Sequence, residues 1–166
     1  MKFEMQLNGL EGTLAMLNAL PQEVVSKRGG PVRKALRRGA VVLLNEARSN
    51  LQAAIARADD ADDKTSTGLL LKNLVVTRGK APADGKGERY LVRVRRKQYA
   101  DRKGEVVTTL KAAQLKEYGR EDQPAAPWLR PAFAAKAEQA IRVVEADMLT
   151  SVNRAVAALA AKYRSR

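Results

Sequence analysis

Residues 131–164 read PAFAAKAEQAIRVVEADMLTSVNRAVAALAAKYR, and this stretch decides the fold. Its apolar residues recur at intervals of 4-4-3-4-4-3-4-4, which is the period of one face of an α-helix. They are Phe133, Ala137, Ile141, Val144, Met148, Val152, Ala155, Leu159 and Tyr163. The rhythm predicts a single amphipathic helix that is roughly 50 Å long. A stripe of that length has to be covered by the rest of the chain or by a neighbouring subunit.

A second helical pattern begins at Gly29-Gly30-Pro31, because proline is tolerated in the first turn of a helix. Its apolar stripe has the same spacing and consists of Val32, Leu36, Ala40, Leu43, Ala47, Leu51 and Ala54. The other side is basic and carries Arg33, Lys34, Arg37, Arg38 and Arg48. The first four fan over about 140° of the helix. Any one of them is interpreted as a solvated side chain, whereas the cluster indicates phosphate contact or electrostatic steering.

The sequence that joins these two helices predicts a small antiparallel sheet. Residues 69–78 and 89–97 show the period of two that is typical of strands, and residues 79–88 join them as a hairpin. Tyr90, Val92 and Val94 share one face of the second strand. Basic residues share the other face with Leu91, namely Arg89, Arg93, Arg95 and Lys97. That face is interpreted either as a binding surface or as charge that discourages edge-to-edge aggregation.

Shorter elements and loops complete the pattern: a strand at 3–7, a helix at 10–20, loops at 57–68, 79–88 and 98–109, a helix at 110–118 that ends at Gly119, and a linker at 123–127. Within residues 101–107 the pattern is ambiguous between a turn with a short strand and an excursion. The predicted fold class is α+β: a small antiparallel sheet packed with a long basic helix in the N-terminal half and a long amphipathic C-terminal helix. We expect one domain over residues 1–166, with a body at 1–130 and the helix at 131–164.

The composition excludes several classes of enzyme. The chain has 166 residues, 31 Lys and Arg against 18 Asp and Glu, a formal net charge of +13, and neither His nor Cys. Zinc hydrolases, Ser-His-Asp enzymes and papain-like enzymes are therefore excluded. We expect no catalytic residue, no metal and no cofactor. The positive charge indicates a polyanion such as nucleic acid; the alternatives are that it promotes solubility or balances an acidic protein partner.

Several short motifs resemble known ligand-binding sites but lack the residue spacing that those sites require. Asp59, Asp60, Asp62 and Asp63 lack the spacing of an EF-hand and predict a solvated acidic loop. Lys64-Thr65 has no preceding glycine of a P-loop, and Gly85-Lys86-Gly87 lacks the third glycine of a dinucleotide site. Residues 1–21 have no continuous apolar region, and no apolar run reaches the length of a bilayer. We expect a protein of a cytosol-like compartment with no membrane partner.

The most specific stretch lies directly before the C-terminal helix. Glu117-Tyr118-Gly119 is followed by Pro124-Ala125-Ala126-Pro127-Trp128-Leu129-Arg130-Pro131-Ala132-Phe133. This acidic-aromatic-Gly turn and Pro-aromatic-Leu-Arg-Pro-Ala run resemble the tail-completion or head–tail joining proteins of tailed bacteriophages, also called minor tail components. The order of the upstream elements fits this family too, and the resemblance covers nearly the whole chain.

The resemblance implies a structural virion protein and not an enzyme. Such a protein is assembled in the cytoplasm of the host bacterium and forms a homo-oligomeric ring, commonly a hexamer, at the neck of the virion. Its neighbours would be a head-connector or portal-side neck protein and a tail terminator or tail tube protein. DNA would pass through the lumen as a transient, non-specific partner. The alternatives are a tail terminator and a basic nucleic-acid-binding protein without a virion role.

Two groups of candidate site residues follow. Pro127 and Pro131 fix the backbone around a Trp and an Arg, which is the composition of an interface anchor. The predicted subunit or partner interface comprises Tyr118, Gly119, Pro127, Trp128, Leu129, Arg130, Pro131 and Phe133. An equally weighted alternative is that Trp128 plugs the core below the helix start. The candidates for a DNA-facing or acidic-partner-facing surface are Arg33, Lys34, Arg37, Arg38, Arg89, Arg93, Arg95 and Lys97.

Overall fold

The protein is described by a computed structural model, which covers residues 30–59, 68–80, 88–100, 104–121 and 123–164. The described elements are α2 (Gly30–Asp59), α3 (Leu69–Asn73), β1 (Leu74–Arg78), β2 (Tyr90–Val94), β3 (Gln98–Ala100), β4 (Val106–Thr108), α4 (Thr109–Tyr118) and α5 (Leu129–Arg164). The predicted strand at 3–7 and helix at 10–20 lie outside the described residues. The predicted α+β class is confirmed.

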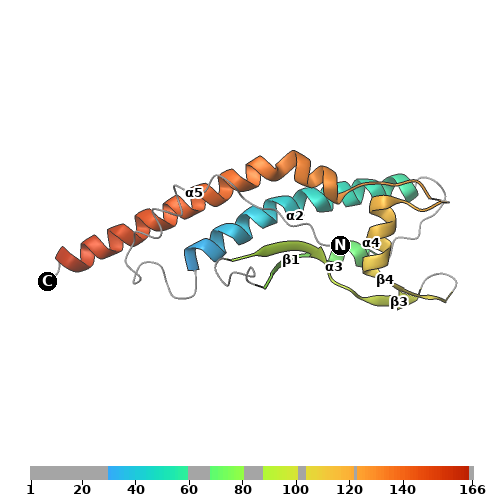
Figure 1. The fold of residues 1–166 in the computed structure, drawn as a ribbon, viewed down its shortest axis with the longest axis horizontal. Helices are drawn as coiled ribbons and strands as arrows, with labels where there is room; N and C mark the ends of the chain where they lie inside the picture. The colour runs from blue at the N-terminus through green and yellow to red at the C-terminus, as the bar shows by residue number, and fades with distance from the viewer. Residues whose placement is uncertain (1–29, 60–67, 81–87, 101–103, 122, 165–166) are drawn as a thin grey trace.

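The long helices and the first hairpin form three layers, with α2 in the middle (Figure 1). The β1–β2 hairpin packs on one side of α2 and α5 packs on the other. The two helices run antiparallel, since Asn50 Nδ2 donates to the carbonyl of Trp128 while Arg38 pairs with Asp147. Both helices follow the predicted apolar stripes, because each has to bury one face against its neighbour. None of the helices in the described ranges combines the length and apolarity that crossing a membrane requires.

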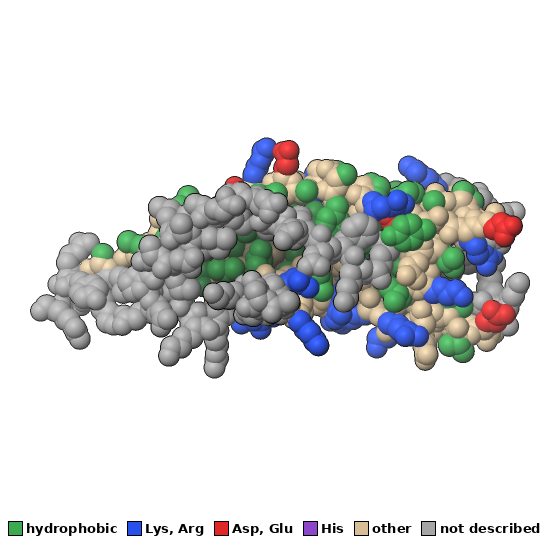
Figure 2. Space-filling view, viewed as in Figure 1, with side chains coloured by type: hydrophobic (Ala, Val, Ile, Leu, Met, Phe, Trp, Pro, Cys, Tyr) green, Lys and Arg blue, Asp and Glu red, His purple; other side chains and the backbone are tan. Residues whose placement is uncertain are grey.

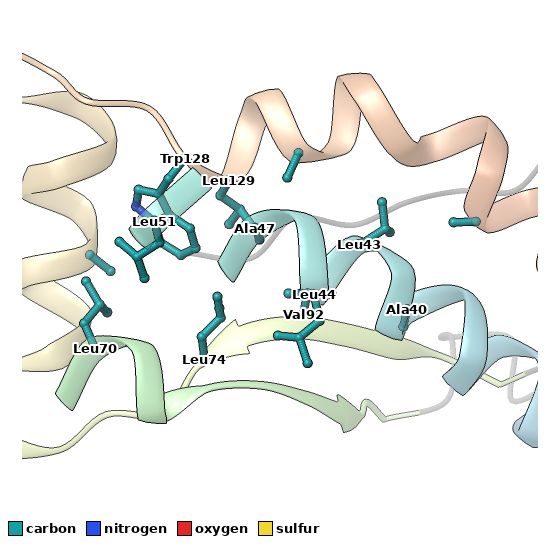
Figure 3. Packing of buried hydrophobic residues seen from close by; sticks show 13 residues of the cluster. Ala40, Leu43, Leu44, Ala47, Leu51, Leu70, Leu74, Val92, Trp128 and Leu129 are labelled. Atoms are coloured by element: carbon teal, nitrogen blue, oxygen red, sulfur yellow. The ribbon is translucent and has the colours of Figure 1, made fainter. Parts of the chain in front are cut away.

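The core lies where α2 meets the hairpin, α4 and the start of α5 (Figure 3). Trp128 and Leu51 lie side by side there, with Leu74 of β1 and Leu70 of α3 close by. A smaller cluster joins the first turns of α2 to the middle of α5 through Ala35, Val144 and Met148. Alanines line much of the α2 stripe, so the α2–α5 packing is close.

The predicted strand at 69–78 is wrong in its first half, because α3 occupies residues 69–73. Gly68 begins this helix with φ 66°, and the Lys72 N–H closes a turn onto the Gly68 carbonyl at 3.0 Å. Leu70 and Leu74 are buried but Lys72 between them is exposed, whereas in a strand residues 70, 72 and 74 would share one face. From residue 74 onward the strand prediction is confirmed, with Leu74 paired to Val94 and Arg78 to Tyr90.

The sheet prediction is also wrong in its extent. β2 ends at Val94, where the Arg95 N–H donates to the Asn73 carbonyl at 2.8 Å. Residues 98–109, predicted as a loop, contain a second hairpin in which β3 pairs with β4. Two separate two-stranded sheets therefore replace the single small sheet. Of the two interpretations of residues 101–107, β4 confirms the short strand, whereas β3 was missed. Each strand has only three residues, which is too short for a periodic signal.

The remaining boundaries differ by a few residues. α2 continues through residues 57–59, which had been assigned to the loop at 57–68. α5 begins at Leu129, two residues before the predicted start. α4 confirms the predicted helix and ends at Gly119, whose φ of 76° terminates it. The acidic loop predicted around Asp60, together with the other motifs rejected between residues 60 and 87, lies outside the described residues.

Candidate functional site: the α4–α5 connection and the basic surface

The segment between α4 and α5 is held by one buried carboxylate, that of Glu117. Its Oε2 accepts hydrogen bonds from the backbone N–H groups of Trp128 and Leu129, each at 2.8 Å. Its Oε1 accepts from the N–H of Arg130 at 3.1 Å. The next residue, Pro131, has no N–H to satisfy. All the backbone donors at the start of α5 that lack a partner within the helix are thus accounted for.

The side chain of Arg130 also donates hydrogen bonds to Glu117. Its Nε donates to Glu117 Oε1 at 2.9 Å and its Nη2 donates to the Glu117 carbonyl at 3.0 Å. Glu117 is fully buried, whereas about half of the Arg130 side chain is exposed. The guanidinium lies 5.0 Å from the centroid of the Tyr118 ring, a cation–π contact. The end of α4 and the start of α5 therefore form one cross-linked unit.

The hydrogen bonds decide the protonation of Glu117. Burial alone raises the pKa of the Glu117 carboxyl. The donors from Leu129, Trp128 and Arg130 outweigh burial and hold the pKa below its ordinary value of 4.5. The group is therefore a carboxylate at neutral pH, as its role as an acceptor of four hydrogen bonds requires.

Gly119 turns the chain directly after α4. Its φ of 76° and ψ of −177° belong to a region that only glycine occupies easily. A Cβ there would lie 2.7 Å from the Ala125 nitrogen and 2.9 Å from the Gln123 oxygen, both backbone atoms. Gly119 thus sets the path of the connection between α4 and α5.

Two predicted interface residues are corrected by their burial. Trp128 is fully buried and Leu129 nearly so, within the core of this same chain. Of the two interpretations of Trp128, the core plug is confirmed and the interface anchor is wrong. Its indole ring lies among Leu51 and other core residues, so no partner can reach it (Figure 3). The indole Nε1 has no hydrogen-bond partner among the described residues.

The rest of the predicted interface lies at the surface. Tyr118 is 55% exposed, Pro127 and Pro131 are exposed, and Phe133 is partly buried against the core. With the exposed half of Arg130, the structure brings Tyr118, Arg130 and the two prolines together around the start of α5. An exposed Tyr–Arg pair held by a buried carboxylate retains the composition of an interface anchor.

The predicted basic residues separate into paired and unpaired groups. Arg38 forms an ion pair with Asp147, and Arg33 lies 3.9 Å from Glu88, which itself holds Arg78 through two hydrogen bonds. Arg89 is partly buried. Lys34 and Arg37 are exposed on α2. The α2 cluster is therefore partly committed to holding α5 and the hairpin in place.

Arg93, Arg95 and Lys97 are exposed and form no ion pair with any described residue. Three further exposed cations, which the sequence did not single out, lie between these residues in the chain or in α3 and α4, which backbone hydrogen bonds join to residues 95 and 97: Lys72, Arg96 and Lys111. We call these six residues the basic surface. Figure 2 shows Lys and Arg side chains along the side of the molecule on which Figure 1 places the strands.

Glu117 is the main site residue that sequence reasoning missed. The signal was present, because residues 128–131 contain none of the usual N-cap residues and α5 has no acidic residue in its first turn. A buried helix start of this kind needs an acceptor from elsewhere. Among the described residues, no group of three acidic side chains is placed to hold a metal ion.

Comparison of the chain with family models, with curated proteins and with solved structures gave no match. The resemblance to phage tail-completion proteins therefore stays a prediction.

Proposed function

We propose that the protein is a structural subunit of the neck of a tailed phage, which forms an oligomeric ring that completes the tail and joins it to the head connector. DNA passes through the lumen of this ring. The subunit contacts a tail terminator or tail tube protein on one side and a portal-side neck protein on the other. The proposal includes no catalytic step and no cofactor.

The observation that carries the ring is the length of α5 relative to the body that covers it. Ala35 of α2 lies in one cluster with Met148 of α5, and α2 begins only five residues before Ala35. Because the helices are antiparallel, the last turns of α5 continue past the start of α2 (Figure 1). Val156 is 47% exposed on this part of α5, and Leu149, which is 52% exposed, lies seven residues before it within the segment that packs on the first turns of α2. A second copy of the chain would bury them.

A second contact surface supports the same proposal. Tyr118 and Arg130 are exposed beside two prolines at the other end of α5. One helix thus presents a candidate contact near each of its ends, as a head-to-tail ring requires, because a heterologous interface joins two different patches.

Mass measurement of the purified protein and of purified necks tests the ring. We expect a closed oligomer in the neck. The isolated protein also forms this oligomer if the contacts between subunits are strong enough without the neighbouring neck proteins. A protein that is monomeric at every concentration and also monomeric inside particles would contradict the proposal. Omission of the protein is expected to leave heads and tails unjoined, which electron microscopy of the lysate would show.

A nucleic-acid-binding protein without a virion role is the second candidate, and the basic surface favours it. The two candidates differ in location. Mass spectrometry of purified particles should detect the chain in fixed copy number if it belongs to the neck. Its absence from particles, together with DNA binding by the purified protein, would favour the second candidate.

A further inference from the structure

The six residues of the basic surface belong to neighbouring points of the fold. The Arg95 N–H donates to the Asn73 carbonyl at 2.8 Å, which sets Arg95 beside the end of α3 and hence near Lys72. The Thr109 N–H donates to the Lys97 carbonyl at 2.9 Å, and the Lys97 N–H donates to Thr109 Oγ1 at the same distance. These bonds bring residues 93–97 against the first turn of α4, where Lys111 lies.

The start of α4 adds to the positive potential at this place. The Thr108 hydroxyl accepts from the Lys111 N–H at 3.2 Å, and the first turn contains no acidic residue. The positive end of the helix dipole therefore lies beside Lys97 without a compensating carboxylate in that turn.

Mutual repulsion among these like charges destabilises the folded protein unless a counter-charge is supplied. Three of the described carboxylates are used elsewhere: Glu88 holds Arg78, Asp147 holds Arg38, and Glu117 caps α5. No ion pair between described residues involves any member of the basic surface. The repulsion among six cations is relieved most effectively by a polyanion, which also gains entropy from released counterions.

The surroundings of the basic surface favour phosphates over an acidic protein. The cores of protein interfaces are depleted of charge and enriched in aromatic and apolar side chains. The large apolar side chains that are exposed among the described residues are Val106, Tyr118, Leu149 and Val156, and none belongs to α3, to β2 or to residues 95–97. Three of the six cations are arginines, whose planar fork matches a phosphate.

We infer that the basic surface binds the phosphate backbone of double-stranded DNA without reading its sequence. Lys72, Arg93, Arg95, Arg96, Lys97 and Lys111 make the contacts. This inference deepens the proposed function, on which its biological meaning rests, by assigning the surface that faces the DNA path. The binding itself is a property of the purified subunit and is measured without a ring.

The test is the salt dependence of binding to a mixed-sequence DNA duplex, followed by fluorescence anisotropy between about 50 and 200 mM salt. Six phosphate contacts predict a slope of about −5 for log Kobs against log salt. The variant Arg93→Ala with Arg95→Ala should lower the magnitude of the slope by about 2 and weaken binding equally for unrelated sequences. These side chains make no ion pair with a described residue, so the fold should be retained.

The matched control is Arg142→Ala with Arg154→Ala, two exposed arginines of α5. Both double variants lower the net charge from +13 by two, and the control also removes the exposed Arg142–Glu138 ion pair, which contributes little to stability. The control should leave the slope near that of the parent. The variant Arg93→Lys with Arg95→Lys keeps the charge and should restore the slope, which separates loss of charge from a change in folding.

Three results would overturn the inference: no duplex binding at low salt, the same loss of slope in both alanine variants, or competition by polyglutamate as strong as by DNA at equal charge. The last would assign the surface to an acidic protein. Native mass measurement on the same samples separates this inference from the ring. An oligomer that does not bind DNA overturns only the inference, and a DNA-binding chain that never assembles overturns only the ring.

Discussion

At the scale of single residues, Glu117 links two elements through hydrogen bonds that no neutral side chain could replace. In Glu117→Gln an amide NH₂ would face N–H donors in either orientation, those of Trp128 and Leu129 or those of Arg130. We expect a loss of about 3 kcal/mol in the free energy of unfolding, since a buried charged acceptor is removed and its donors lose their partner. Urea denaturation measures this loss. Glu121→Gln, an exposed carboxyl of the same segment, should change stability little.

The lowered pKa of Glu117 makes a pH prediction of definite sign. Because the folded pKa lies below the ordinary value of 4.5, the carboxylate contributes its full stability above that value. The contribution is lost as the pH falls through the folded pKa. Thermal melts should therefore show a steeper acid decline for the parent than for Glu117→Gln. Parallel declines for the two proteins would show that the first turn of α5 does not depend on this carboxylate.

Gly119 allows a clean separation of backbone strain from steric clash. Both Gly119 and Gly104 have positive φ, 76° and 79°, but only at Gly119 would a Cβ meet backbone atoms. We expect Gly119→Ala to cost about 3 kcal/mol and Gly104→Ala about 1 kcal/mol. The difference between their unfolding free energies measures the contact with residues 123–125. Equal losses would mean that the connection shifts to admit the methyl group.

At the scale of elements, Gly39 sets the distance between α2 and α5. A Cβ at Gly39 would lie 2.5 Å from Val144 Cγ2 and 2.9 Å from the Ala140 carbonyl oxygen. An alanine in a helix normally stabilises it by up to about 1 kcal/mol relative to glycine. Here we expect Gly39→Ala to destabilise by about 1–3 kcal/mol, because the backbone of α5 must move.

Ala53→Gly, at an exposed position of α2, provides the reference for that measurement. It reports the intrinsic preference of this helix for alanine without any contact to α5. If Gly39→Ala raises the free energy of unfolding by as much as Ala53→Gly lowers it, then α5 is free to move away from α2. Chemical denaturation of both variants decides between the two results.

The sequence predicted the elements whose burial is periodic. α2 and the part of α5 that packs on it each bury one stripe, so the spacing of Leu43, Ala47 and Leu51, or of Val144 and Met148, was sufficient. The apolar face of the second strand was also predicted, because Tyr90, Val92 and Val94 pack on the core while Arg93 is exposed. α3 was missed because Leu69-Leu70-Leu71 is apolar on every face, and only contacts with α4 and the core decide between helix and strand.

The candidate site was predictable in composition but not in orientation. The Glu117–Phe133 segment stood out, yet which of its side chains point inward depends on the path that Gly119 imposes between α4 and α5. Similarly, the spacing of the basic residues grouped Arg33 and Arg38 with Arg93. Their separation into paired and unpaired cations depends on Glu88 and Asp147, which are distant in sequence.

At the scale of the whole molecule, the two surfaces proposed for assembly and for DNA lie on different layers. The apolar positions Leu149 and Val156 belong to α5, and the basic surface belongs to the strands, α3 and α4, with α2 between α5 and the β1–β2 hairpin (Figure 1). A ring could therefore close through α5 while its cations remain accessible. This arrangement predicts that the two functions can be removed separately by substitution.

Leu149 and Val156 provide the corresponding assembly test. They are seven residues apart, so they lie on the same side of α5 two turns from each other. We expect Leu149→Glu with Val156→Glu to abolish assembly of the ring, because two carboxylates would be buried without partners at each interface.

The control Thr150→Glu with Ala157→Glu places the same charges, at the same spacing, on another exposed side of α5. Native mass spectrometry should find oligomers for the control and monomers for the first pair, while circular dichroism shows equal helix content in both. Oligomers of unchanged size in the Leu149 and Val156 variant would exclude this face of α5 from the interface and leave the exposed Tyr118–Arg130 pair as the surface to test next.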